Sequence, residues 1–193
     1  MFIENLTQPG QNTGWIEIIT GPMFSGKTEE LIRRIRRAQI AKQEVGIYKP
    51  AMENRYATDK IVSHNKKEEQ SIGVNSSAEI IDLSKSNRVV AIDEAQFFDN
   101  DLAMVVSLLA NSGKRVIIAG LDMDYLGKPF GVMPQLMAIA EYITKLHSIC
   151  MDCGNPAIFS YRLIQTQNQL VELGAQDKYT PLCRPCYQKK MNR

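Results

Sequence analysis

The order of hydrophobic and polar residues changes along the chain between two regular patterns. Short apolar runs, the last two apolar at nearly every position, predict strands that are buried in a sheet. These strands are expected at residues 15–20, 45–49, 88–92 and 115–119. Apolar residues at helical spacing predict helices between them. These helices are expected at residues 27–42, 76–83 (with Ser76 or Ser77 as N-cap) and 102–110. Strands that alternate with helices predict a doubly wound parallel α/β sheet.

Three segments lack these patterns. Residues 1–14 are rich in Gln, Asn, Thr, Pro and Gly, and we expect a flexible leader there. Residues 51–75 are polar and weakly patterned, which predicts an irregular stretch. From Cys150 onward the chain contains all four cysteines, several turn residues and no long helical pattern, so a small second module is expected. The predicted organisation is a leader (1–14), an α/β domain (15–146) and a C-terminal module (147–193).

Composition limits the location and the partners. The 193 residues carry a net charge of +2, which argues against a dedicated binder of nucleic acid or of membrane surfaces. No apolar run approaches the ~18 residues of a spanning helix, and the polar N-terminus is unlike a secretory signal. We therefore expect a cytoplasmic protein without a membrane partner. In that compartment cysteines are more often metal ligands or free thiols than disulfides.

The segment between the first predicted strand and the first predicted helix matches the phosphate-binding pattern G-x-x-x-x-G-K-S/T. Its glycines allow the backbone to wrap around phosphate oxygens, and the following helix presents free N–H groups to the same anion. The lysine reaches the β- and γ-phosphates of ATP, and the threonine hydroxyl binds Mg²⁺. We therefore expect a site for ATP and Mg²⁺ made by Gly21, Pro22, Met23, Phe24, Ser25, Gly26, Lys27 and Thr28.

A second apolar strand ends at Asp93 and Glu94, on the edge of the sheet where open α/β folds bind ligands. Asp93 is expected to hold Mg²⁺, directly or through water, and Glu94 is free to act as a base. Gln96, in the same segment, is assigned to the nucleotide site. The segment is also similar to the Asp-Glu-Ala-Gln box of some helicases, so a nucleic-acid-dependent ATPase is an alternative. Fewer than fifty residues follow the α/β domain, too few for the second lobe of a helicase.

The four cysteines form two C-x-x-C pairs, Cys150 with Cys153 and Cys183 with Cys186. Four thiolates on two tight turns are typical of a tetrahedral structural Zn²⁺ site, which leaves no open position for catalysis. The 29 residues between the pairs exceed the about 15–20 of a zinc ribbon, which predicts a projecting loop. A loop that closes over a ligand and a plain hairpin are equally compatible with this spacing, and buried thiols or a redox pair are the alternatives to a metal site.

Together these motifs resemble the type II, cytosolic-type thymidine kinase family over nearly the whole chain. The resemblance rests on the phosphate loop, Asp93–Phe98, Leu121-Asp122 with Lys128–Gly131, both cysteine pairs and Gly174–Tyr179. It implies a RecA-like P-loop parallel sheet with a small C-terminal zinc-ribbon or lasso domain, usually in a homotetramer (or a dimer). It also implies transfer of the ATP γ-phosphate to the 5′-hydroxyl of thymidine or deoxyuridine, which serves nucleotide salvage for DNA synthesis.

The resemblance assigns roles position by position. Glu94 corresponds to the base that accepts the 5′-hydroxyl proton, the role that the strand-end argument also gives it. Arg162 corresponds to an arginine that stabilises transition-state charge, and Arg55 to a basic residue near the phosphates. Glu53 stands where the family more often has aspartate, so it is given no role. The nucleoside pocket is expected to comprise Met23, Phe97, Leu121, Tyr125 and Phe130 around the base, and Leu170, Val171, Glu172, Leu173, Gly174 and Tyr179 in the lasso.

Two other classes of function are alternatives to a nucleoside kinase. A regulatory ATPase with a zinc ribbon predicts hydrolysis stimulated by DNA or RNA, but the near-neutral charge argues against a nucleic-acid partner. A zinc scaffold without activity leaves the phosphate loop unexplained. The chain ends seven residues after Cys186, without the regulatory tail of animal members, which favours a bacterial form. The isolated His64 and His147 are given no catalytic role.

Overall fold

The computed structural model describes residues 13–51, 60–62, 68–163 and 178–192. At its centre lies a six-stranded sheet in which neighbouring strands all run parallel. Across the sheet the strands are β5 (Ile72–Val74), β2 (Val45–Pro50), β6 (Val89–Ile92), β7 (Arg115–Gly120), β1 (Trp15–Thr20) and β8 (Tyr142–Lys145). The predicted α/β class with a parallel sheet is confirmed.

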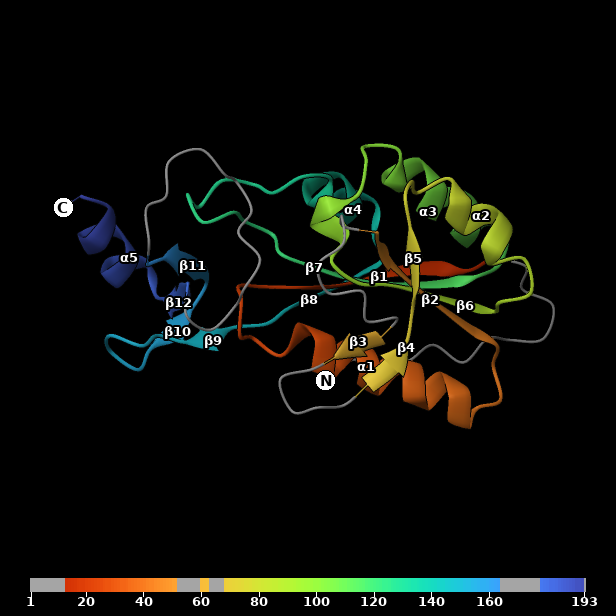
Figure 1. Ribbon diagram of the computed structural model, residues 1–193, viewed down its shortest axis with the longest axis horizontal. Helices are drawn as coiled ribbons and strands as arrows, with labels where there is room; N and C mark the ends of the chain where they lie inside the picture. The colour runs from red at the N-terminus through yellow and green to blue at the C-terminus, as the bar shows by residue number, and fades with distance from the viewer. Residues whose placement is uncertain (1–12, 52–59, 63–67, 164–177, 193) are drawn as a thin grey trace.

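Helices cover both faces of this sheet (Figure 1). They are α1 (Lys27–Ile40) on one face, and α2 (Glu79–Leu83), α3 (Leu102–Asn111) and α4 (Met133–Ile139) on the other. Successive residues of a central strand pack into opposite layers: Ile118 joins the core under α3, and Ile117 the core under α1. Because both faces are covered, these strands must be apolar at nearly every position.

The prediction of an irregular stretch at residues 51–75 is wrong in part. This span contains β5, at the edge of the main sheet, and two strands that pair with each other antiparallel. The two strands are β3 (Lys60–Val62) and β4 (Glu68–Gln70). β5 has only three residues, of which Ile72 and Gly73 are exposed. A strand this short with one buried residue has no detectable apolar pattern, and pairing with β2 decides its conformation.

The predicted N-cap of the second helix is also wrong. α2 begins at Glu79, and Ala78 occupies the N-cap position. Ser77 uses both its N–H and its hydroxyl to donate to the carboxylate of Asp99, at 2.8 and 2.5 Å. The serine is therefore bound to the loop before α3 and is not available to cap its own helix.

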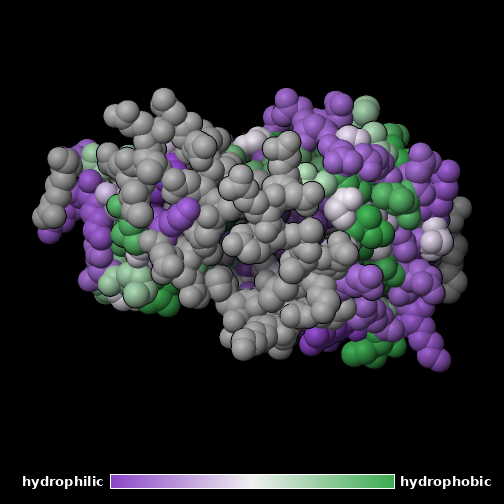
Figure 2. Space-filling view, in the orientation of Figure 1, coloured by the Kyte–Doolittle hydropathy of each residue, from purple (hydrophilic) through white to green (hydrophobic). Residues whose placement is uncertain are grey.

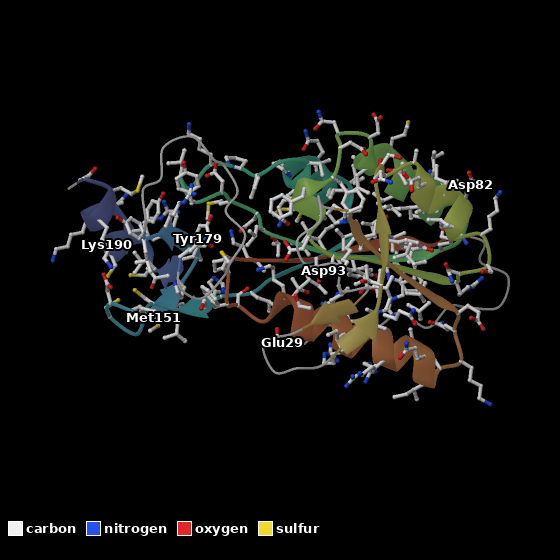
Figure 3. All side chains as sticks on the ribbon, viewed as in Figure 1. Glu29, Asp82, Asp93, Met151, Tyr179 and Lys190 are labelled. Atoms are coloured by element: carbon white, nitrogen blue, oxygen red, sulfur yellow. The ribbon has the colours of Figure 1, made fainter. Side chains whose placement is uncertain are left out.

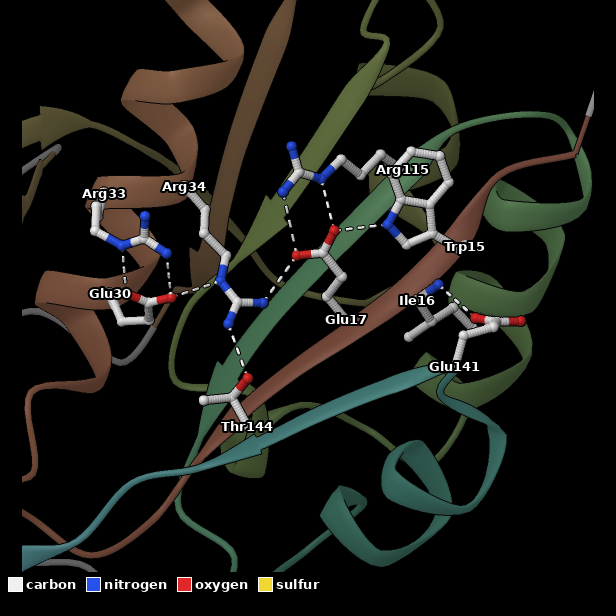
Figure 4. A network of polar contacts seen from close by, with 9 residues as sticks. All are labelled: Trp15, Ile16, Glu17, Glu30, Arg33, Arg34, Arg115, Glu141 and Thr144. Atoms are coloured by element: carbon white, nitrogen blue, oxygen red, sulfur yellow. Dashed lines mark hydrogen bonds and ion pairs between the residues drawn. The ribbon is translucent and has the colours of Figure 1, made fainter. Parts of the chain in front are cut away.

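A network of buried charges ties α1 to the sheet (Figure 4). Glu17 of β1 is fully buried and accepts hydrogen bonds from Arg34 of α1 at 2.8 Å and from Arg115 of β7 at 2.7 Å. Other members of the network are Trp15, Glu30 and Thr144. Because each of these buried charges faces an opposite charge, their mutual attraction offsets the loss of hydration.

The cysteine module, residues 147–163 and 178–192, lies beyond one end of the sheet (Figure 1). It contains β9 (Ser148–Ile149) paired with β10 (Pro156–Ala157), β11 (Phe159–Arg162) paired with β12 (Tyr179–Leu182), and α5 (Arg184–Met191). Its small core includes Phe159 and Tyr187, whose rings stack with centroids 4.2 Å apart. α5 has no counterpart among the sequence predictions.

The surface of the described α/β part mixes residues of both kinds. Figure 2 shows hydrophobic residues interspersed with hydrophilic ones over this part of the visible face. Among the described helices, none combines the length and the apolar composition that crossing a membrane requires. Scattered exposed apolar side chains, such as Met104 and Leu108 of α3, are ordinary for a folded domain.

Candidate active site

The predicted phosphate loop connects β1 to α1 at the carboxyl end of the parallel strands. Gly21 has φ 141°, and a Cβ there would lie 2.3 Å from the carbonyl oxygen of Leu146. Gly26, the N-cap of α1, has φ 84°. Both positions therefore require glycine. The loop leads into the N-terminus of α1, where helical N–H groups without an internal partner bind anions.

Lys27 folds back into this loop. Its Nζ donates to the carbonyl oxygen of Pro22 at 2.7 Å, and the Ser25 hydroxyl donates to the same oxygen at 2.8 Å. Desolvation lowers the pKa of Lys27, although the carboxylates of Glu94 and Asp93 act in the opposite direction. The ammonium group is thus held inside the loop, close to two carboxylates, where an incoming phosphate can replace the Pro22 carbonyl as its acceptor.

Asp93 is buried just past the end of β6, between the centre of the sheet and the cysteine module (Figure 3). Burial and the neighbouring Glu94 charge raise the pKa of Asp93 to about 7, and the opposing effects of Lys27 and of a hydrogen bond from Thr28 are smaller. The Thr28 hydroxyl and the Asp93 carboxylate are thus adjacent. Oxygen donors of this kind are the ligands that Mg²⁺ prefers, so the pair fits the predicted metal site.

Glu94 is exposed and has a left-handed backbone conformation, with φ 54°. Its carboxylate accepts a hydrogen bond from Nε2 of Gln96. Gln96 is buried, and its Oε1 accepts from the N–H of Leu121, at the end of β7, at 3.0 Å. The amide therefore links the glutamate to the neighbouring strand. An uncommon backbone conformation in a residue with a directed carboxylate is typical of functional sites.

Several predicted nucleoside-pocket residues come together. Phe97 and Phe130 make an edge-to-face contact with ring centroids 5.5 Å apart. The Arg162 guanidinium of β11 lies 5.1 Å from the centroid of the Tyr125 ring, and Arg162 pairs in register with Tyr179 of β12. The loop after β7 is thereby packed against the cysteine module. Met23 and Leu121 are both half-buried.

Three contacts at this edge involve residues that the sequence did not single out. Lys145, at the end of β8, forms an ion pair with the buried Asp122 at 2.7 Å, and Asp122 acts electrostatically on Lys27. Two serines of the cysteine module, Ser148 and Ser160, bond to the phosphate loop. Neither a lysine at a strand end nor a lone serine carries a sequence signal, although Asp122 belongs to the Leu-Asp pair used for the resemblance.

The four cysteine sulfurs lie within 4.8 Å of one another. Burial raises the pKa of Cys150, but N–H groups of Cys183, Asp152 and Cys153 donate to its sulfur and bring the pKa down to about 6. The surrounding sulfurs raise the pKa of Cys186 to about 12. Four sulfurs in this spacing, with N–H groups directed at one of them, fit the thiolate set of a structural zinc ion.

Some predicted residues lie outside the described ones. They are Glu53, Arg55, His64 and the lasso residues Leu170, Val171, Glu172, Leu173 and Gly174. His147 is exposed between β8 and β9.

Comparisons with known proteins agree in one result. A family model described as thymidine kinase matches residues 14–187. The chain is 56% identical over 179 residues to a thymidine kinase of Rhodothermus sp. (strain ITI 518), covering 93% of this chain and 84% of that protein. It is 50% identical over 191 residues to one of Bacteroides fragilis (strain YCH46), covering 99% and 96%, and 51% identical over 187 residues to one of Bacteroides thetaiotaomicron, covering 97% and 94%.

Proposed function

The chain belongs to the thymidine kinase family, and from that premise we propose that it transfers the γ-phosphoryl group of ATP to the 5′-hydroxyl of thymidine and of deoxyuridine. One observation carries the assignment of the site. Four residues meet at the carboxyl end of the parallel strands: Lys27 of the phosphate loop, Thr28, the buried Asp93 and the exposed Glu94. Phosphoryl transfer to an alcohol requires these groups together: a phosphate cradle, a cation, metal ligands and a base.

The phosphate loop binds the triphosphate. Phosphate oxygens approach the N-terminus of α1, and Lys27 exchanges its bond to the Pro22 carbonyl for a bond to a β- or γ-phosphate oxygen. Thr28 and Asp93 would hold Mg²⁺, which when bound would neutralise charge on the phosphate oxygens. Burial and the Glu94 charge raise the pKa of Asp93 to about 7, so the carboxyl would ionise more readily with a cation beside it.

Glu94 acts as the general base. Its carboxylate accepts the proton of the 5′-hydroxyl while the oxygen of that hydroxyl bonds to the γ-phosphorus. The bond from the γ-phosphorus to the bridging oxygen breaks, and ADP leaves. Gln96 restricts the Glu94 side chain through the hydrogen bond that it donates, so the base is oriented before the nucleoside binds.

The aromatic groups that meet beside this edge form the nucleoside pocket. Phe97 and Phe130 supply an apolar wall for the base, and Arg162 over the Tyr125 ring brings positive charge to the same side. The lasso residues and Arg55 complete the site in this proposal. The four cysteines would hold a structural Zn²⁺, which in this proposal anchors the lasso. Three further points stay predictions: the assembly as a homotetramer or dimer, the domain boundaries and the cytoplasmic location.

The test is a turnover assay with purified protein, Mg²⁺–ATP and a panel of nucleosides, followed by chromatography of the monophosphates. We expect thymidine monophosphate from thymidine and deoxyuridine monophosphate from deoxyuridine, with ADP in equal amount. Phosphorylation of no nucleoside by protein that binds zinc and ATP would contradict the proposal. ATP hydrolysis stimulated by DNA or RNA would then support the alternative ATPase.

A further inference from the structure

Two buried serines of the cysteine module are bonded to the backbone of the phosphate loop. The hydroxyl oxygen of Ser160, in β11, accepts a hydrogen bond from the N–H of Met23 at 2.9 Å. The hydroxyl of Ser148, in β9, donates to the carbonyl oxygen of Phe24 at 3.2 Å. Each serine side chain is only 6% exposed. Both hydroxyls are thus committed to a segment more than a hundred residues away in the chain.

The two bonds lie on either side of a strained residue. Phe24 has φ 63°, a left-handed conformation that costs a non-glycine residue about 1–2 kcal/mol. The peptide before Met23 is held by Ser160, and the peptide after Phe24 is held by Ser148. Such a conformation persists only where surrounding structure fixes it. The serines supply that constraint from outside the loop.

Each serine is closely connected to one cysteine pair. Ser148 precedes Cys150 by two residues. Ser160 stands opposite Pro181 in the β11–β12 ladder, and Pro181 precedes Cys183 by two residues. A metal ion shared by the two cysteine pairs would therefore fix β9 relative to β12. Because Ser148 lies in β9 and Ser160 in β11, the partner of β12, the ion would also fix the two hydroxyls that bond to the phosphate loop. The sulfurs of Cys153 and Cys183, one from each pair, are already 3.4 Å apart.

We infer that Ser148 and Ser160 are positioning residues for the phosphate loop, and that through them the metal at the four cysteines strengthens nucleotide binding. The inference rests on the proposed function only in taking the phosphate loop as the ATP site. It adds a second action of the metal to the proposed anchoring of the lasso, namely that the same ion would pre-organise the phosphate loop. A pre-organised loop binds phosphate without the cost of ordering itself.

The first test measures binding of Mg²⁺–ATP, without nucleoside, to zinc-loaded protein. Ser160→Ala and Ser148→Ala each remove one hydrogen bond, and we expect each to raise the Kd for Mg²⁺–ATP by about 2- to 12-fold. Ser160→Thr keeps the hydroxyl and should restore most of the affinity. Ser107→Ala is the matched control, because its hydroxyl also bonds a backbone carbonyl, that of Ala103, but within α3. It should leave the Kd unchanged.

The second test compares zinc-loaded with chelator-treated protein, after far-UV circular dichroism has shown that the α/β part stays folded. Metal removal should raise the Kd for Mg²⁺–ATP of the wild type, and raise it less in the Ser148→Ala/Ser160→Ala double variant. By linkage, a saturating Mg²⁺–ATP concentration should strengthen zinc binding by the same factor. If metal removal affects the wild type and the double variant equally, the metal does not act through the serines, and that part of the inference is wrong.

Other outcomes separate the inference from the proposed function. If both serine variants bind Mg²⁺–ATP as the wild type does, while Lys27→Met abolishes binding, the positioning role is wrong and the phosphate loop is still the ATP site. If Lys27→Met itself binds Mg²⁺–ATP like the wild type, the phosphate loop is not the ATP site, and both proposals are overturned. Serine variants that lose affinity, while Ser107→Ala does not, support the inference, because a general effect of losing one hydroxyl hydrogen bond would change the Kd in all three alike.

Discussion

Glu17 and Asp93 are both buried carboxylates of the central sheet, yet their surroundings differ. Glu17 is bonded to two arginines, which themselves contact further polar groups. Asp93 has another carboxylate beside it and a single nearby lysine, and burial with the Glu94 charge raises its pKa to about 7. The charges around Glu17 are matched within the fold, so they serve stability. Asp93 and Glu94 are like charges side by side with Lys27 as a nearby cation, so further positive charge from a ligand reduces their repulsion, and they serve binding and chemistry.

Glu94→Gln should give the largest effect and tests the catalytic side of this comparison. The amide cannot accept the 5′-hydroxyl proton, so we expect kcat for thymidine to fall by about 10²–10⁴-fold. The Kd for Mg²⁺–ATP and the melting temperature should change little, since Glu94 is exposed. Glu44→Gln, an exposed change before β2, serves as control. A Glu94→Gln protein with full kcat would remove the base from the mechanism.

Glu17→Gln should give the next largest effect, on stability. Loss of the buried negative charge leaves Arg34 and Arg115 without a carboxylate between them, and we expect the free energy of unfolding to fall by about 3–5 kcal/mol. Glu30→Gln is the matched control. It removes a second carboxylate bound to Arg34, but one that is partly exposed, so it should cost about 1 kcal/mol or less. Denaturant unfolding measures both, and equal losses would refute the burial argument.

Lys114→Met sharpens the comparison with a cation that is bonded to neutral backbone carbonyls. Nζ of Lys114 donates to the carbonyl oxygens of Ser84 and Asn87, at 2.8 and 2.6 Å, at the end of α2. We expect a loss of about 1–3 kcal/mol in the free energy of unfolding, between those of the two glutamate variants. Lys85→Met, which breaks an exposed ion pair with Asp82, should lower the free energy of unfolding much less than Lys114→Met does. A larger loss for Lys85→Met than for Lys114→Met would contradict this ranking.

Asp99→Asn should give the smallest effect, and one that depends on pH. Burial raises the pKa of Asp99, but hydrogen bonds from Ser77 and from the N–H of Asp101 outweigh it and leave the pKa below its usual value. A carboxyl with a lowered pKa stabilises the fold above its unfolded pKa of about 3.9, and this stabilisation is lost as the pH falls through the folded pKa. The free energy of unfolding of the wild type should therefore exceed that of Asp99→Asn by about 1 kcal/mol at pH 7, and the two values should become equal in acid.

Melting temperatures of the wild type and Asp99→Asn across pH 3–7 test this prediction, with Asp101→Asn as control. A difference in stability that grew as the pH fell would contradict the assigned sign.

Local patterns decided which parts of the fold and site were predictable. The buried strands and the longer helices were found because parallel strands covered on both faces need continuous apolar runs. β5 was missed because three residues at a sheet edge carry no such run. The serine cap failed because Ser77 had a competing partner, Asp99, twenty-two residues away. Arg55 and the lasso residues stay predictions.

Local motifs in the sequence were enough to predict the chemistry. The spacing Gly21–Thr28, the strand end at Asp93 and Glu94, and the two cysteine pairs each place their functional atoms within a few residues, so short-range geometry suffices to predict them. The contacts between these parts depend on the folded arrangement of the chain. The bonds from Ser148 and Ser160 exist because the cysteine module packs against the phosphate loop. The ion pair of Lys145 with Asp122 exists because the parallel strands β8 and β7 finish at the same end of the sheet. No local pattern encodes such contacts, since they depend on where the chain returns.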